Sequence, residues 1–249
     1  MQKIAFACST LFILSASKEL PSFIEKCKLI EEEDVGECIK DRINVLKPRL
    51  VNGIPEMKLP SIDPLHIPKM EIHTGSGSGV AFDAVVTKMD VFGGKDTEVV
   101  EVRLNLKTRT GLLHLKFPNL YVVGTYSIKG KVLLFDLQTK GPMTGNITDI
   151  DATTKFGFDV VEKNGQKYIK MKSTDIEVSN SFKNAVMRFD NLFDNQELNN
   201  QINIALNENV QELAKEVGPL VHDATHLLVV GVLNPVFNDY SIDELFIRS

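Results

Sequence analysis

The chain has 249 residues, of which 43% are hydrophobic and 24% charged, and its formal net charge at pH 7 is −5. A chain of this length and composition can bury a sizeable core within one domain. The slight acidic excess, 33 Asp and Glu against 28 Lys and Arg, argues against binding nucleic acid through bulk positive charge.

The N-terminal segment, residues 1–17, has the pattern of a secretory signal peptide. Lys3 is its positive residue, residues 4–14 are an apolar run, and Ser15-Ala16-Ser17 is a small-residue cleavage site. The run is too short to cross a bilayer, which takes about twenty apolar residues. We therefore expect a secreted, extracellular protein without an integral membrane span, whose mature chain, residues 18–249, is a single domain.

Two cysteines remain once Cys8 leaves with the signal. Cys27 and Cys38 are an even pair in an oxidising compartment, so a disulfide is the expected state. The rival interpretation is a metal site, but two thiolates without clustered histidines make a poor zinc ligand set. We expect neither a metal nor a cofactor.

The first part of the mature chain, residues 18–53, is predicted to be helical. A short first turn follows Pro21, and the main helix starts at Asp34, with Glu37 in capping-box position. Four prolines then punctuate residues 54–68 and keep their preceding residues out of the helical region, so this segment should cross the body in an extended conformation.

Residues 80–178 alternate apolar and polar side chains, the period of strands with one buried face. The Gly- and Ser-rich residues 75–79 that precede them are predicted to form a flexible turn. Lys129-Gly130 is a plausible two-residue hairpin turn, and it would place Tyr126 opposite Leu133.

Asn164-Gly165 is a stronger signal, since this dipeptide favours a type I′ turn. It places Val160 opposite Ile169 and Phe158 opposite Met171, all on one face. Several predicted strands exceed ten residues, which indicates a curved, strongly twisted antiparallel meander rather than a flat sheet.

A very long helix is predicted for residues 195–233. Its apolar residues recur at steps of three and four, which keeps them in one stripe. Asp194 and Glu197 are the expected capping pair, Gly218-Pro219 should kink the helix, and Asn234-Pro235 should end it.

Such a rod would be about 55–60 Å long at about 1.5 Å per residue, so an equally long apolar surface must cover its stripe. The predicted fold class is therefore α+β, with a highly curved antiparallel sheet wrapped around a long C-terminal helix. A wrap of this kind either packs solid or leaves a tube along the helix.

Several motifs follow one another through the mature chain. They are Cys27 with Cys38, Gly53-Ile54-Pro55-Glu56, Leu59-Pro60-Ser61-Ile62-Asp63-Pro64-Leu65, Ile67-Pro68, Phe117-Pro118, Gly124-Thr125-Tyr126-Ser127-Ile128, Phe189-Asp190-Asn191-Leu192-Phe193 and Asp243-Glu244-Leu245-Phe246. In the order and spacing of these residues, the chain resembles the insect takeout family and the related haemolymph juvenile-hormone-binding proteins. The resemblance implies a tubular lipid-binding fold with an apolar tunnel. It also implies carriage of juvenile hormone or other lipophilic molecules, with roles in feeding, chemosensation and circadian physiology.

One feature departs from the hormone-binding members of that family, which are similar to one another in carrying a second disulfide nearer the C-terminus. This chain has no cysteine after Cys38, which places it with the takeout branch. The resemblance therefore leaves juvenile-hormone-like terpenoids, fatty ligands and isoprenoids open as cargo.

The candidate ligand-lining residues lie on the inward faces of the predicted strands and on the helical stripe. They are Phe82, Tyr126, Leu133, Phe135, Phe156, Phe158, Met171, Leu206, Val210, Leu213, Val217 and Leu220. Each is equally a core residue if no tunnel exists. The hydroxyl of Tyr126 should point inward and needs a polar partner, which is either a ligand oxygen or internal backbone or water.

Other motifs have ordinary explanations. His222 and His226 are spaced like zinc ligands, but no third ligand is near, and a helical projection places them opposite the apolar stripe, on a solvated face. Asn146 opens a glycosylation sequon and should face solvent. No nucleophile–base pair is recognisable, so we do not expect an enzyme.

The sequence thus predicts a secreted, monomeric carrier of one hydrophobic small molecule, without nucleic-acid partners. The alternative is a secreted interaction or scavenger protein that acts through its surface and has a packed interior.

Overall fold

The structure is a computed structural model, and it describes residues 19–29, 34–73, 80–132 and 135–248. Nearly half of the described residues belong to one seven-stranded antiparallel sheet. Its strands are β2 (Leu65–His73), β3 (Val80–Phe92), β4 (Glu98–Asn105), β5 (Thr110–Val132), β6 (Phe135–Lys163), β7 (Gln166–Ser181) and β8 (Asn184–Phe189). The helices are α1 (Gly36–Leu50), α2 (Gln196–Glu208), α3 (Val210–Asp239) and α4 (Ile242–Leu245), with short 3-10 turns η1 (Pro55–Met57) and η2 (Gly94–Asp96).

Two very long strands form the spine of the sheet. β5 has 23 residues and β6 has 29, and they pair along almost their whole length. β3 and β4 pair with opposite halves of β5, whereas β7 and β8 pair with opposite halves of β6. One half of the sheet is therefore β4-β5-β6-β7 and the other is β2-β3-β5-β6-β8.

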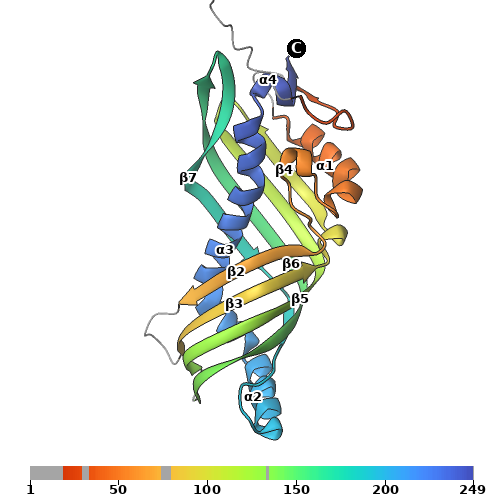
Figure 1. Cartoon of the computed structure of the whole chain (residues 1–249). Helices are drawn as coiled ribbons and strands as arrows, with labels where there is room; N and C mark the ends of the chain where they lie inside the picture. Colours follow the sequence, from red (N-terminus) through yellow and green to blue (C-terminus); the bar gives the residue numbers. More distant parts are fainter. Residues whose placement is uncertain (1–18, 30–33, 74–79, 133–134, 249) are drawn as a thin grey trace, which may run out of the picture.

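Each helix lies at an edge of this sheet. α1 contacts β4, α2 contacts β8, and α3 contacts β7 in one half and β2 in the other. Figure 1 shows the resulting elongated molecule, with α1 and α4 at one end, α2 at the opposite end, and the strands curving around α3. Because β7 and β2 are edges of different halves, α3 crosses the open side of the curved sheet from one edge to the other.

The predicted antiparallel sheet with strands longer than ten residues is confirmed, and so is the hairpin at Asn164-Gly165. Phe158 pairs with Met171 and Val160 with Ile169, as expected. Both turn residues have positive φ (53° and 77°), which a type I′ turn requires.

The predicted turn at Lys129-Gly130 is wrong. β5 continues to Val132, and Tyr126 pairs with Gly141 rather than with Leu133. Gly130 adopts a φ of 136° without leaving the strand, and it pairs in register with Phe82 of β3 and Leu137 of β6. Leu133 lies outside the described residues, as do residues 75–79 and the predicted signal segment 1–17.

The single helix predicted for residues 195–233 is two helices that meet at Asn209. The φ and ψ of Asn209 are −105° and 15°, and its side-chain amide donates to the carbonyl of Ala205 at 2.7 Å. Asparagine competes in this way for backbone groups, which favours a break. The N-cap is Asn195, which accepts from the amide of Leu198, rather than Asp194.

The helix also continues past its predicted end at Asn234-Pro235, to Asp239. Pro235 cannot donate to the carbonyl of Gly231, the residue four positions earlier. Gly231 is exposed, so water can satisfy that carbonyl and the helix tolerates the proline.

The predicted Cys27–Cys38 disulfide is present. It ties α1 to β1 (Cys27–Leu29), which pairs in parallel with β9 (Phe246–Arg248) and is a strand where the sequence predicted a helical turn. The predicted start at Asp34, with Glu37 in a capping box, is wrong: α1 begins at Gly36, and its N-cap is Val35, without a side-chain cap. The carboxylate of Asp34 instead accepts from the amides of both Gly36 and Leu104, so it joins the start of the helix to β4.

Candidate functional site

Two hydrogen bonds fix α3 along the edge of β7. The amide of Val178 donates to Nε2 of His222 at 3.4 Å, and the side-chain amide of Asn180 donates to Oγ1 of Thr225 at 3.1 Å. Polar groups of α3 thus satisfy part of an unpaired strand edge, which would otherwise be open to other chains.

Packed apolar clusters occupy both ends of the concave face. The first cluster lies beside β7 and includes Phe156 and Phe158, with Met171 packed against it. The second lies toward α2 and includes Tyr126, with Phe82 and Leu206 packed against it. Six of the predicted lining residues therefore separate into two groups.

The other six predicted lining residues stay predictions. Val210 and Leu213 are partly exposed at the start of α3. Leu133, and the side chains of Phe135, Val217 and Leu220, lie outside what the structure describes.

Between the two clusters, the inner face of β5 and β6 carries apolar residues that remain partly exposed. We call them the mid-sheet strip: Leu113, Leu115, Phe117 and Ile150. Alternation places them on the inner face, because a Cβ at Gly111 would meet the ring of Phe156, and His114 and Lys116 pair with Asp151 on the other face.

The strip contrasts with its neighbours along the same strands. Phe156 and Phe158 at one end are 6% and 0% exposed, and Val122 and Tyr126 at the other are 7% and 3% exposed. The apolar surface of the strip is thus incompletely covered, although it lies midway along the inner face of a curved sheet.

Tyr126 has the internal partner that the sequence left open. Its hydroxyl donates to the carbonyl of Asp190 at 2.7 Å, and its ring meets Phe189 edge to face, with 5.3 Å between centroids. Burial raises the pKa of Tyr126 to about 12, against the opposing effect of a hydrogen bond with Thr139. The phenol is therefore a structural donor whose proton is held by the backbone.

Sequence reasoning missed an asparagine ladder on α2. The side-chain oxygens of Asn199, Asn203 and Asn207 accept from the amides of Leu192, Phe189 and Met187, at 2.7–2.8 Å. Their four-residue spacing was the available signal, since it puts all three on one face. The ladder takes the place of a further strand along β8.

The prediction of a solvated histidine face on α3 is also wrong. His222 accepts from β7, and Nε2 of His226 is buried. The projection assumed that one stripe of the helix was covered, whereas α3 touches two sheet edges.

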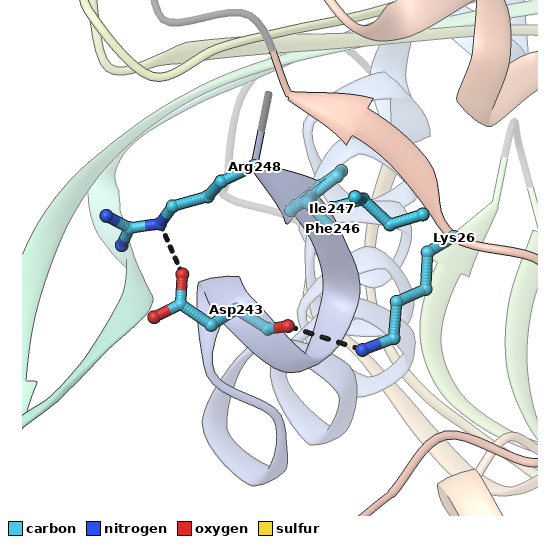
Figure 2. Close-up of a pocket in the computed structure, with 5 residues that line it drawn as sticks. All are labelled: Lys26, Asp243, Phe246, Ile247 and Arg248. Carbon is cyan, nitrogen blue, oxygen red and sulfur yellow. Dashed lines mark hydrogen bonds and ion pairs between the residues drawn. The ribbon is translucent and has the colours of Figure 1, made fainter.

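The outer surface of the described residues includes two open depressions that can be compared with the predicted site. The first, of about 430 Å³, lies at β9, where Lys26 donates to the carbonyl of Asp243, and Arg248 pairs with its carboxylate (Figure 2). The second, of about 510 Å³, is bordered by the adjacent rings of Phe92 and Tyr121. Neither contains a predicted lining residue.

The described residues contain no group of three His, Cys, Asp or Glu side chains that could hold a metal ion. In the same part of the chain, no helix is both long and apolar enough to cross a membrane. Asn146 is exposed on β6, between Tyr121 of β5 and Val186 of β8, as the sequence predicted.

The fold is a large antiparallel sheet accompanied by a few helices. It is similar to the crystal structure of Epiphyas postvittana Takeout 1, with a TM-score of 0.72 and 19% identity, over 90% of this chain and all of that one. The profile of the Haemolymph juvenile hormone binding protein family matches residues 4–247, and the chain belongs to that family.

Two relatives align with this chain over nearly its whole length. The chain is 25% identical to the Circadian clock-controlled protein daywake of Drosophila yakuba and 24% identical to that of Drosophila melanogaster. Each alignment covers 94% of this chain and 90% of the relative.

Proposed function

We propose that this protein is a secreted carrier that holds one elongated lipophilic molecule in a tunnel between α3 and the central strands. The mid-sheet strip is the observation that carries the proposal. Its apolar side chains face inward yet stay partly exposed, between two packed clusters and under a helix whose main sheet contacts are with the edges β7 and β2. A ligand there would cover apolar surface that the protein leaves uncovered.

The energetics favour a long, mostly apolar ligand. Each buried methylene contributes about 0.8 kcal/mol, so a chain that runs along the strip can bind well with few polar contacts. The name of the family supports a terpenoid such as juvenile hormone, and fatty or isoprenoid molecules have the same shape and chemistry. Phe82, Phe156, Phe158, Met171 and Leu206 would close the two ends of such a site.

Secretion is part of the proposal. A structural disulfide is typical of oxidising compartments, and residues 1–17 have the pattern of a signal peptide. N-terminal sequencing of secreted protein should find residues 18–249 as one folded chain that begins at Lys18. Its mass should fall on amidase treatment if Asn146 carries a glycan, and Thr148→Ala should abolish that difference. The secreted protein should also elute as a monomer in gel filtration.

The name of the curated relatives supports a daily rhythm in the amount of this protein. Transcript and protein levels sampled through a light–dark cycle should oscillate with a period of one day. Constant levels would separate this chain from those relatives in regulation while leaving its ligand chemistry open.

Binding to delipidated protein tests the carrier function directly. A fluorescent long-chain fatty acid should bind saturably with one-to-one stoichiometry, and juvenile hormone, fatty acids and isoprenoids should be competed against it. Organic extracts of the secreted protein, analysed by mass spectrometry, should contain one class of lipid. Absence of saturable binding by every apolar probe would favour the alternative, a protein that acts through its surface with a packed interior.

A further inference from the structure

His226 has a buried polar atom that the fold itself does not satisfy. Its Nε2 is buried, and it has no hydrogen-bond partner among the residues that the structure describes. A buried polar atom without a partner is costly and uncommon, and such atoms in native proteins usually have a reason. The search for that reason starts from where this histidine lies.

The hydrogen bonds of its neighbours fix its level along the sheet. His222 and Thr225 are held by Val178 and Asn180 of β7. Strand pairing continues these two rows across the sheet, from Val178 through Thr154 to Leu113, and from Asn180 through Ala152 to Leu115. His226 is therefore level with the mid-sheet strip.

The face of α3 that carries His226 is turned toward the interior. His226, Val230, Leu233 and Phe237 follow one another at steps of four, three and four residues, so they share one face of the helix. The last three belong to, or pack against, the first apolar cluster. His226 precedes them by one turn, on the side of the cluster where the partly exposed apolar surface begins.

We infer that Nε2 of His226 is the polar anchor of the ligand site and donates a hydrogen bond to an oxygen of the bound lipid. The chemical class is an elongated apolar molecule with one acceptor group, an ester, ether or carboxyl oxygen, rather than a pure hydrocarbon. This inference rests on the proposed carrier function and adds the position and the polarity of the group that orients the cargo.

The test measures the affinities of two long-chain ligands of matched length, methyl palmitate and an alkane, for wild-type protein and for His226→Leu. The ester should bind the variant about 3- to 10-fold more weakly, the worth of one neutral hydrogen bond. The alkane should bind equally well or better. The thermal midpoint of the ligand-free variant should rise, because the substitution removes an unpartnered buried nitrogen.

Two further variants complete the design. His226→Gln retains a donor and should restore part of the preference for the ester, and it also keeps the test valid if the leucine variant fails to fold. His66→Leu is the matched control, since His66 is exposed and pairs with Asp90; it should leave both affinities unchanged.

Equal losses for ester and alkane, or no loss for either, would overturn the anchor while the carrier function stands. A lower midpoint in both His226 variants, without a change in the ratio of the two affinities, would make His226 a structural residue. Failure of wild-type protein to bind either probe would overturn the carrier function itself, and the anchor with it.

Discussion

The substitution Ala152→Phe distinguishes a tunnel from a solid interior. Ala152 lies on the inner face of β6, pairs with Leu115 of the mid-sheet strip, and is partly exposed. If the space in front of it is free, a phenyl ring enters without strain, and the free energy of unfolding should change by less than about 1 kcal/mol. In a packed interior the same ring would overpack the core, at a cost of roughly 1–3 kcal/mol.

The effect on binding follows from the same geometry. A ring that displaces about three ligand methylenes, at about 0.8 kcal/mol each, lowers the affinity for a long chain roughly 50-fold. A short chain that fits beyond the obstruction should lose much less. The assay is therefore a series of fatty acids of increasing length, titrated on Ala152→Phe and on wild-type protein.

Ala84→Phe is the matched control, since Ala84 is 7% exposed within the packed part of β3. It should destabilise the protein by roughly 1–3 kcal/mol. Equal destabilisation by both substitutions, together with an unchanged dependence on chain length, would refute a continuous tunnel at the strip.

Three other changes test individual contacts. Tyr126→Phe should lower the free energy of unfolding by about 1 kcal/mol. Because folding raises the pKa of the Tyr126 phenol to about 12, its contribution to wild-type stability is fully present below pH 10 and is lost as the pH rises from 10 to about 12. Urea titrations over this pH range should show a smaller fall in the free energy of unfolding for the variant than for wild-type protein. Cys38→Ser should lower the free energy of unfolding by about 2–3 kcal/mol, measured against wild-type protein with its disulfide intact. Asn203→Leu should cost at least about 2 kcal/mol and speed hydrogen exchange in β8, whereas Gln201→Leu, on the exposed face, should change stability by less than about 0.5 kcal/mol.

The sequence alone was sufficient for features that depend on local chemistry. Alternation in residues 80–178 predicted long antiparallel strands with one inward face, and Asn164-Gly165 predicted a hairpin register that the structure confirms. The pairing of Cys27 with Cys38 followed from the count of cysteines in a chain predicted to be secreted. These features need no knowledge of distant residues, because backbone dihedral preferences and side-chain periodicity act over a few positions.

Tertiary structure decided where those elements meet. The ladder of asparagines on α2 depends on the unpaired edge of β8, which no local pattern reveals. The continuation of β5 to Val132 could not be predicted, because a glycine such as Gly130 is compatible with a turn and with a strand alike.

The candidate site shows the same division. Inward-facing residues were predictable, but their separation into two packed clusters and a partly exposed strip depends on the curvature of the sheet and the path of α3. A helical projection assumes that one side of a helix is covered, so it placed His226 in solvent. α3 instead contacts edges in both halves of the sheet, and Nε2 of His226 is buried.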